Sequence, residues 1–497
     1  MPLTRRRFSG AALLGLTRKS GRAIPGGFAD RSHEAGHRLR DGATAPAPRD
    51  RRRIPAVIVG GGIAGLSAAW RFQKRGFRDF VVLEMEAQAG GNARWGENEI
   101  TGFPWAAHYV PLPGPGAPLV REMMADLGVL RGGEWEERYL CHSPQERLYL
   151  HGRWQEGLEP DVGATNADRD QYRRFHEKME EFSRSGEFRI PMETGARRQT
   201  GLDRLPMREW LREQRFDSPY LLWLVDYACR DDYGARAADT SAWAGIHYFA
   251  ARSRESERGP LTWPEGNGWI VRRLMDRLGG AVRTGAFVHR IMRAGSRWRV
   301  WTAQQEYEAE AVVFAAPTFL ARYMMEEAPR WECVYSPWLT ANLTLERPPR
   351  DRGPAPPSWD NVIFKSPALG YVVATHQSLR SHVDRSVWTY YWALADGPPA
   401  ANRRRLLETP WETWKEAILD DLAQAHPDIR DCVSRIDIMR LGHAMPRPTP
   451  GFLSRRRPQS GSLFWANSDQ SGIPLFEEAQ YRGAGAADAA LRLLGKA

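Results

Sequence analysis

The chain has few cysteines, no long apolar run and no cluster of metal-binding residues. Its 497 residues include four cysteines, at positions 141, 229, 333 and 432, and no two of them form a C-x-x-C pair. This wide separation gives no thiolate metal site and indicates buried thiols. The 12 histidines are also unclustered, and no segment approaches the roughly 18 apolar residues of a membrane span. The sequence therefore predicts neither a metal centre nor a transmembrane helix.

The positive charge of the chain is concentrated at its N-terminus. Residues 1–53 contain 13 Arg or Lys and 4 Asp or Glu, so they hold +9 of the net charge of +10. The rest of the chain is nearly neutral. The high isoelectric point therefore describes a tail, and the body carries no charge pattern typical of a nucleic-acid partner.

The body has the composition and length of a globular protein with two or three domains. It is 42% hydrophobic and 26% charged, and its length allows substantial cores. The 20 tryptophans favour aromatic-lined clefts, although most tryptophans pack in cores.

The most informative stretch is A-V-I-V-G-G-G-I-A-G at residues 56–65. Residues 57–59 predict a buried strand, and residues 66–74 predict a helix. A G-x-G-x-x-G pattern lies between them. Its first glycine allows a tight turn, the second lets the backbone approach a pyrophosphate, and the third lets helix and strand pack closely. The three glycines are Gly60, Gly62 and Gly65.

A second predicted strand, residues 80–83, ends in Glu84, 24 residues after Gly60. An acidic residue at this place binds a ribose diol, whereas an arginine would suit a 2′-phosphate. A glycine-rich turn without a ligand is the alternative, because the glycine pattern alone is weak evidence. The strand, the helix and Glu84 together indicate a dinucleotide and disfavour NADP.

The residues after Glu84 point to one family. The run V-V-L-E-x(5)-G-G ends in the pair Gly90 and Gly91, and it resembles the FAD-binding motif of the flavin amine oxidase and phytoene desaturase superfamily. The resemblance implies that this glycine pair passes close to the FAD phosphates. Gln88 and Asn92 stand where the family often has arginine.

Further segments resemble the same family in the same order. Residues 264–269 and the helix after them resemble its mid-chain P-x-G-G helix, and residues 311–317 resemble the strand that returns to the sheet. Residues 464–472 resemble its C-terminal A-G-D segment, whose acidic residue holds the ribityl or phosphate part of FAD; this role passes to Asp469. A C-terminal helix over residues 476–494 would point its N-terminal amides at the flavin ring.

The resemblance therefore implies one non-covalent FAD, since no cysteine lies in the C-terminal segment. The residues that it assigns to the FAD site are Gly60, Gly62, Ile63, Ala64, Gly65, Glu84, Met85, Gly90, Gly91, Asn92, Val288, Ala316, Asp469, Gly472 and Ile473.

The expected fold class is α/β. A Rossmann-like FAD-binding domain with a parallel sheet would carry an inserted α+β substrate domain. We expect the FAD domain to comprise residues 54–110, 260–325 and 435–497, and the substrate domain to comprise 111–259 and 326–434. Residues 1–53 would form a basic leader and linker.

Flavin oxidation needs little from catalytic side chains, because the protein mainly supplies geometry and a dry pocket. Two candidates remain. Lys365 could hold a water near flavin N5, as a strand lysine does in amine oxidases, or it could be an ordinary solvated lysine. His108 follows the first FAD unit, where the family's chain often passes the flavin.

Two other patterns have both a functional and a structural interpretation. The acidic turn of Asp231, Asp232, Tyr233 and Gly234 could bind a cationic substrate, although a helix cap is favoured. Trp388, Tyr390 and Trp392 alternate on one strand face, with Tyr391 opposite. This aromatic stripe could cradle an amine, although core packing is favoured.

The resemblance implies an FAD-dependent oxidoreductase that oxidises a small amine by hydride transfer to flavin N5. A carotenoid-like desaturase or isomerase, and a non-enzymatic binding protein on the same fold, are the alternatives. Val271 stands where a second G-x-G-x-x-G would need its last glycine, so no NADPH domain is expected. Electrons would pass to oxygen, a quinone or a protein, and the oligomeric state stays open.

The N-terminus resembles an export signal. Residues 4–8, T-R-R-R-F, resemble a twin-arginine motif, and residues 11–16 supply a short apolar stretch. Such signals export folded, cofactor-loaded proteins to the periplasm. A disordered basic leader on a cytoplasmic protein is the alternative.

Overall fold

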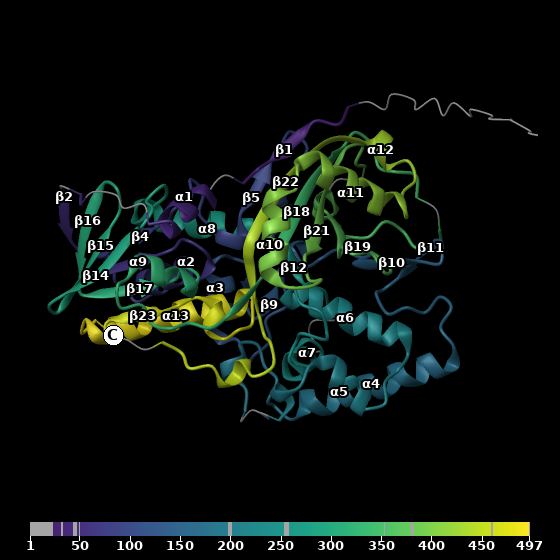
Figure 1. The fold of residues 1–497 in the computed structure, drawn as a ribbon, viewed down its shortest axis with the longest axis horizontal. Coiled ribbons are helices and arrows are strands. Elements are labelled where there is room, and N and C mark those ends of the chain that lie inside the picture. The colour runs from purple at the N-terminus through teal and green to yellow at the C-terminus, as the bar shows by residue number, and fades with distance from the viewer. Residues whose placement is uncertain are drawn as a thin grey trace, which may run out of the picture.

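The computed structural model describes residues 23–496 except 31–32, 43–46, 49, 197–200, 253–257, 352, 379–381 and 459–460. Two bodies lie side by side: a dinucleotide-binding domain on the left of Figure 1 and a second domain on the right. The twin-arginine motif at residues 4–8 lies outside the described residues.

A five-stranded parallel sheet forms the centre of the dinucleotide-binding domain. Its order is β13 (Val282–Arg283), β4 (Phe80–Leu83), β3 (Ala56–Val59), β17 (Ala311–Phe314) and β23 (Leu463–Trp465). Every residue of β3, β4 and β17 is buried. Unbroken apolar strands are typical of a parallel sheet that is covered on both faces.

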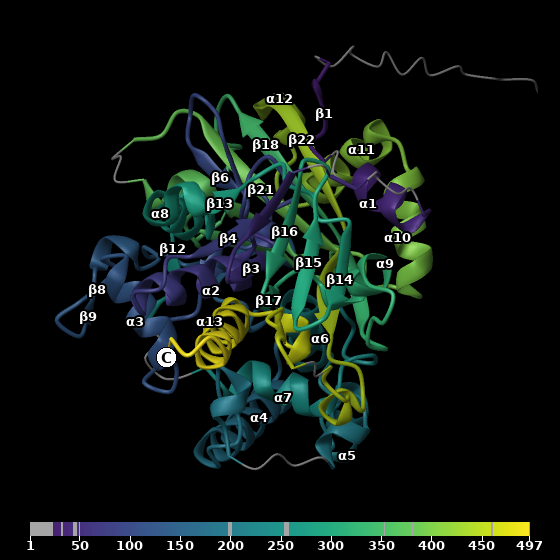
Figure 2. The ribbon, with the colours of Figure 1, turned by 90° about the vertical axis from the view of Figure 1, so that its left-hand side faces the viewer.

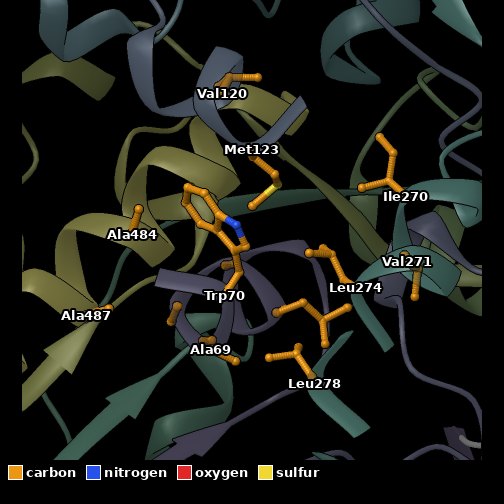
Figure 3. Packing of buried hydrophobic residues seen from close by; sticks show 14 of the residues in the cluster. Ala69, Trp70, Val120, Met123, Ile270, Val271, Leu274, Leu278, Ala484 and Ala487 are labelled. Carbon is orange, nitrogen blue, oxygen red and sulfur yellow. The ribbon is translucent and has the colours of Figure 1, made fainter. Parts of the chain in front are cut away.

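Four helices cover one face of this sheet. They are α2 (Ile63–Lys74), α3 (Pro118–Asp126), α8 (Gly268–Leu278) and α13 (Phe476–Leu493). Trp70 of α2 is fully buried and lies among Met123, Leu274 and Ala484, one from each of the other helices (Figure 3). The close approach of α13 to α2 requires Gly483, because a Cβ there would lie 2.0 Å from the Ala64 carbonyl oxygen.

A four-stranded sheet covers the other face. It contains β14 (Arg290–Ala294), β15 (Arg297–Trp301), β16 (Gln305–Ala309) and β2 (Asp50–Arg53), in that order; its first three strands face the viewer in Figure 2. Ile291 and Val300 pack against Val57 and Val81 of the central sheet, with the short helix α9 (Ala321–Met324) beside them. The central sheet therefore has a helical layer on one side and a β layer on the other.

The second domain is built on an eight-stranded mixed sheet. Its order is β1 (Gly26–Phe28), β22 (Val433–Arg447), β18 (Val334–Leu345), β21 (Ser386–Ala393), β20 (Gly370–Val373), β19 (Asp360–Ile363), β10 (Glu146–Leu150) and β11 (Arg153–Glu156). Helices α10 (Pro399–Glu408), α11 (Trp411–Ala423) and α12 (Ile429–Cys432) pack with it on one side. Helices α4 (Asn166–Arg184), α5 (Met207–Glu213), α6 (Pro219–Tyr233) and α7 (Ala242–Ala250) form a separate layer at the lower right of Figure 1.

The remaining elements are short. They are α1 (His33–Arg40), β5 (Trp95–Glu97), β6 (Gly102–Pro104), β7 (Tyr109–Val110), β8 (Leu130–Arg131), β9 (Glu134–Trp135) and β12 (Leu261–Thr262). Within the described part of the chain, no helix combines the length and apolar character that a membrane span requires.

The expectation that residues 1–53 form only a leader and linker is wrong for the described part of that segment. Strand β1 pairs in parallel with β22 of the second domain, with Gly26 opposite Ile436. Strand β2 pairs with β16 of the other domain. The hydrogen bonds of these two strands therefore join the segment to both domains.

The expected domain boundary at residue 435 also differs from the structure. Residues 435–447 belong to β22, which pairs with β18 in the sheet of the second domain. Because β22 is long, it reaches from that sheet to the boundary between the domains, where the site lies.

Candidate functional site

A cleft of about 490 Å³ runs between the two domains. One end begins at Val59 and Leu83, the last residues of β3 and β4. The other end reaches α6 and β19 of the second domain. A crevice at the carboxyl ends of parallel strands is where this architecture binds ligands.

The three motif glycines have different physical roles. A Cβ on Gly60 (φ +103°) would lie 2.9 Å from the Ala316 amide nitrogen, and one on Gly65 would lie 1.9 Å from the Gly60 carbonyl oxygen. Gly65 therefore keeps α2 close to the end of β3, and Gly60 keeps this turn close to the loop after β17. Gly62 has an ordinary φ of −74°, and the nearest atom to its Cβ would be 3.9 Å away, at Gly91. Only Gly62 keeps open space in the cleft.

The N-terminus of α2 is available to an anion. Gly62 is its N-cap residue and supplies no side-chain hydrogen bond to the first turn. The backbone N–H groups there have no partner within the helix, and the helix dipole favours negative charge. This end of the cleft therefore suits a pyrophosphate.

Glu84 lies beside this turn, as predicted. Its Oε2 accepts a hydrogen bond from the Gly61 N–H at 2.6 Å, and its Oε1 accepts one from the Glu86 N–H at 2.8 Å. Burial raises the pKa of Glu84, against the opposing effect of these two bonds. The carboxylate is thus held rigidly at the cleft wall.

Most of the predicted cofactor residues line the cleft. Besides Gly60, Gly62 and Glu84, they are Ile63, Ala64, Met85, Gly90, Gly91, Asn92, Val288 and Ala316. The Asn92 amide donates to the Ala444 carbonyl at 2.6 Å, so it connects the glycine pair to β22. Gly65 supports the turn from behind.

Besides Gly65, three predicted residues lie outside the cleft lining: Asp469, Gly472 and Ile473. The buried Asp469 carboxylate accepts hydrogen bonds from the Thr318 N–H at 2.7 Å, the Thr318 hydroxyl at 2.6 Å and the Tyr335 hydroxyl at 2.6 Å. The Asp469 carboxylate therefore binds Thr318 and Tyr335 inside the protein, and it does not face the cleft where we expected it to contact the cofactor. Asn467 and Ser468, just before it, line the cleft instead.

His108 lies in the cleft wall, as expected. Its ring centroid is 4.6 Å from that of Tyr391 and 5.4 Å from that of Trp359. Burial lowers the pKa of His108 to about 4. The imidazole is therefore neutral at physiological pH and does not titrate there.

The expected position of Lys365 beside the cleft is wrong. The residue follows β19, is exposed, and does not line the cleft. Its ammonium lies 5.2 Å from the ring centroid of Phe364. The alternative interpretation, a solvated lysine, matches this placement.

This difference in placement leads to a paired prediction. His108→Phe should slow anaerobic flavin reduction roughly 10- to 100-fold, because it changes a wall of the reacting cavity. Lys365→Met should leave the rate within about twofold of the wild type. Stopped-flow absorbance at matched flavin content measures both. A large effect of Lys365→Met would show that this side chain reaches the cavity in solution.

Carboxylates line the far end of the cleft. Asp231 and Asp232 lie in the last turn of α6, and Asp360 begins β19. Both oxygens of Asp232 accept from Nη2 of Arg252, at 2.8 and 2.7 Å. Among the described residues, none forms an ion pair with Asp231 or Asp360.

The favoured interpretation of the acidic turn as a helix cap is wrong for its aspartates. Gly234, with φ +58°, terminates α6 in the left-handed conformation. Asp231 and Asp232 lie at the negative end of the helix dipole, where acidic side chains are disfavoured. Two carboxylates at this end therefore need another reason, and facing the cavity supplies one.

Aromatic residues complete the far end. They are Tyr109, Tyr227, Trp338 and Tyr391. The stripe of Trp388, Tyr390 and Trp392 packs instead in the core with α11, as the structural alternative predicted. Only tertiary structure could single out Asp360, because one aspartate at the start of a strand carries no sequence signal.

The comparisons with known proteins agree with this geometry. A family model for flavin-containing amine oxidoreductases matches residues 63–490. The chain belongs to that family. It is an FAD-dependent oxidoreductase. The fit of Gly62, the free α2 N-terminus and Glu84 to a dinucleotide supports the FAD site independently of the family match. Bound FAD supplies a two-electron acceptor at the cleft.

Solved structures share the fold at low sequence identity. Wild-type putrescine oxidase bound to putrescine is 17% identical with a TM-score of 0.67, covering 89% of this chain and 100% of that one. Cyclohexylamine oxidase from Brevibacterium oxydans is 16% identical with a TM-score of 0.67, covering 89% and 99%. A putative protoporphyrinogen oxidase from Exiguobacterium is 16% identical with a TM-score of 0.63, covering 90% and 100%.

A curated relative matches only a short stretch. A Baeyer–Villiger monooxygenase of Penicillium patulum is 46% identical over 41 residues, which are 8% of this chain and 7% of its own length. So short a match says nothing about this protein's substrate.

Cysteine chemistry does not contribute to the cofactor site. Cys141, Cys229 and Cys432 are buried, and none of the four cysteines lines the cleft. The described residues hold no group of His, Cys, Asp and Glu suited to a metal ion. The described residues of the cleft therefore offer no cysteine for a thioether bond to FAD.

Proposed function

We propose that the protein oxidises a small aliphatic amine by hydride transfer from the carbon next to nitrogen to FAD. The observation that carries this proposal is the pair Asp231 and Asp360, two carboxylates without an ion pair at the far end of the cofactor cleft. Both are half-buried, and withdrawing a carboxylate from water without a partner is costly, so a cation in the cavity would offset that cost.

The electrostatics of the cavity agree with a cationic substrate. Burial raises the pKa of Asp360, and repulsion from Asp231 and Glu146 raises it further. Arg252 is committed to Asp232. An ammonium group would relieve this repulsion, whereas a carboxylate substrate would increase it.

The aromatic side chains define the shape of the substrate. Tyr109, Trp338 and Tyr391 present apolar rings to the same cavity, and ring faces attract cations. An amine with a short alkyl or cycloalkyl body suits such a wall. Two proteins of the same fold are named as oxidases of putrescine and of cyclohexylamine.

Anaerobic bleaching of the flavin tests the proposal. Cyclohexylamine and putrescine should reduce the flavin within seconds to minutes, whereas cyclohexanol and 1,4-butanediol should not, because they lack the cation. Bleaching by a polyene or by a porphyrinogen, but by no amine, would support the desaturase-like alternative. A flavin that no substrate class reduces would support a binding protein.

Two further features stay proposals. Electrons would leave to oxygen, a quinone or a protein, and reoxidation of the bleached enzyme with each acceptor would distinguish these. Export by the twin-arginine route rests on residues 4–8 and the short apolar stretch at residues 11–16.

A further inference from the structure

Asp231 differs from its neighbour Asp232 in a way that bears on proton transfer. Both lie in the last turn of α6 and line the cavity. Asp232 is buried and held by Arg252. Asp231 is half-buried, and no described residue donates a hydrogen bond to its carboxylate. Its oxygens therefore remain available to a bound substrate.

We propose that Asp231 is the base that takes a proton from the ammonium group of the bound substrate. This assignment rests on the proposed amine oxidation. An amine must be neutral before it can lose hydride, because the nitrogen lone pair supports the developing cation. In this step one N–H bond breaks, its electron pair stays on nitrogen, and an O–H bond forms on Asp231. The products are a neutral amine and a neutral carboxylic acid.

The groups around Asp231 come from several elements. They are Asp232, Arg230 and Tyr227 of α6, Tyr248 of α7, Arg252 after α7, Tyr109 of β7, Glu146 of β10, Asp360 of β19 and Tyr391 of β21. Burial, and then repulsion from Asp232, raises the pKa of Asp231 to about 7. A carboxylate in these surroundings gains from accepting a proton.

Other cavity groups fit the role less well. His108 has a pKa lowered to about 4, so it holds a proton poorly at neutral pH. Burial raises the pKa of the Tyr109 hydroxyl well above its ordinary value, so it is already protonated. The pKa of Asp360 is raised well above its ordinary value, so that carboxyl group gives up its proton less readily than an exposed aspartate does.

The pH dependence of flavin reduction gives the first test, with cyclohexylamine as the probe. The rate constant divided by the half-saturating concentration reports the free enzyme. In the wild type it should fall about tenfold per pH unit below about pH 7, because Asp231 becomes protonated there. In Asp231→Asn this fall below pH 7, the acid limb of the profile, should vanish. The ratio should instead rise with pH towards the pKa of the free amine, near ~10.

A matched variant separates this role from a general effect of charge. Asp360→Asn removes another carboxylate of the same cavity, and it should keep the limb near pH 7. At pH 7.5, Asp231→Asn should be slower than the wild type by about 100-fold, within the range of general base catalysis. Equal flavin content and an unchanged flavin spectrum would show that the variants fold.

Proton release on binding gives a second test that does not need turnover. Calorimetry at pH 8, in two buffers of different ionisation enthalpy, measures cyclohexylamine binding to enzyme whose flavin has been reduced beforehand. The wild type should release almost no proton, because Asp231 receives it. Asp231→Asn should release about one proton per amine bound.

The outcomes distinguish the two proposals. If cyclohexylamine and putrescine neither bleach the flavin nor bind, amine oxidation is wrong and the assignment of Asp231 falls with it. If they bleach the wild type but Asp231→Asn keeps the same limb and the same proton count, only the assignment of Asp231 is wrong.

Discussion

Gly62→Asp should yield a folded protein that contains no FAD. The backbone at Gly62 has φ −74°, which any residue adopts, and an added Cβ would meet nothing closer than 3.9 Å. The fold therefore tolerates a side chain here. That side chain would enter the space beside the α2 N-terminus and place a negative charge where the pyrophosphate binds. Flavin absorbance per chain after purification, and the far-ultraviolet circular dichroism spectrum, measure the two parts of this expectation.

Two matched variants sharpen the result. Gly62→Ala should keep the fold and weaken FAD binding by a smaller factor, because it adds bulk without charge. Gly65→Ala should instead lose the fold or most of its stability, since its Cβ would lie 1.9 Å from the Gly60 carbonyl oxygen. If Gly62→Asp retains a full equivalent of flavin, the phosphates lie elsewhere in the cleft.

Asp469→Ala should lower the free energy of unfolding by about 3–5 kcal/mol, as expected when a buried hydrogen-bonded charge is removed from its partners. The Asp469 carboxylate accepts three hydrogen bonds of 2.6–2.7 Å, from Thr318 and Tyr335. It thereby connects the segment before α13 to the loop after β17 and to β18. The Gln470 amide also donates to this carboxylate at 3.2 Å, so four buried donors lose their acceptor without it. Denaturant unfolding of the flavin-loaded protein measures the loss.

A surface aspartate provides the control. Asp161 is 73% exposed and pairs with Arg169, so Asp161→Ala should change stability by less than about 1 kcal/mol. Asp469→Asn should fall between the two, because it keeps the shape but gives up the charge. An Asp469→Ala protein that unfolds like the wild type but binds FAD weakly would support the direct cofactor contact that the family motif implied.

The predictions that held rest on local patterns. Residues 56–74 form a strand, a turn and a helix, because an apolar run, three spaced glycines and a segment rich in apolar residues follow one another. Glu84 lies where the second strand ends for the same reason. The alternation of Trp388, Tyr390 and Trp392 is local in the same way, and the structure places all three on the strand Ser386–Ala393.

The predictions that failed needed knowledge of distant contacts. Asp360 begins the short strand β19 and Lys365 follows it, yet the exposed lysine lies outside the cavity and the aspartate faces it. Strand alternation places Tyr391 on the opposite face of β21 from Trp388, Tyr390 and Trp392. Helix α11 packs against the face with those three residues, so the face with Tyr391 is the one that meets the cavity. The charge-rich segment 23–53 resembled a linker because its pairing partners, β22 and β16, lie hundreds of residues away.

The sequence by itself determined that this chain carries a dinucleotide turn, a second strand ending in an acid and the motif order of one flavoprotein family. These features are local, since backbone geometry and side-chain spacing along a few residues decide them. The tertiary structure alone decided the chemistry of the cavity. Asp231, Asp360 and Tyr109 come from three separate elements, and the repulsion between the two half-buried carboxylates exists only because the fold brings them to one cavity.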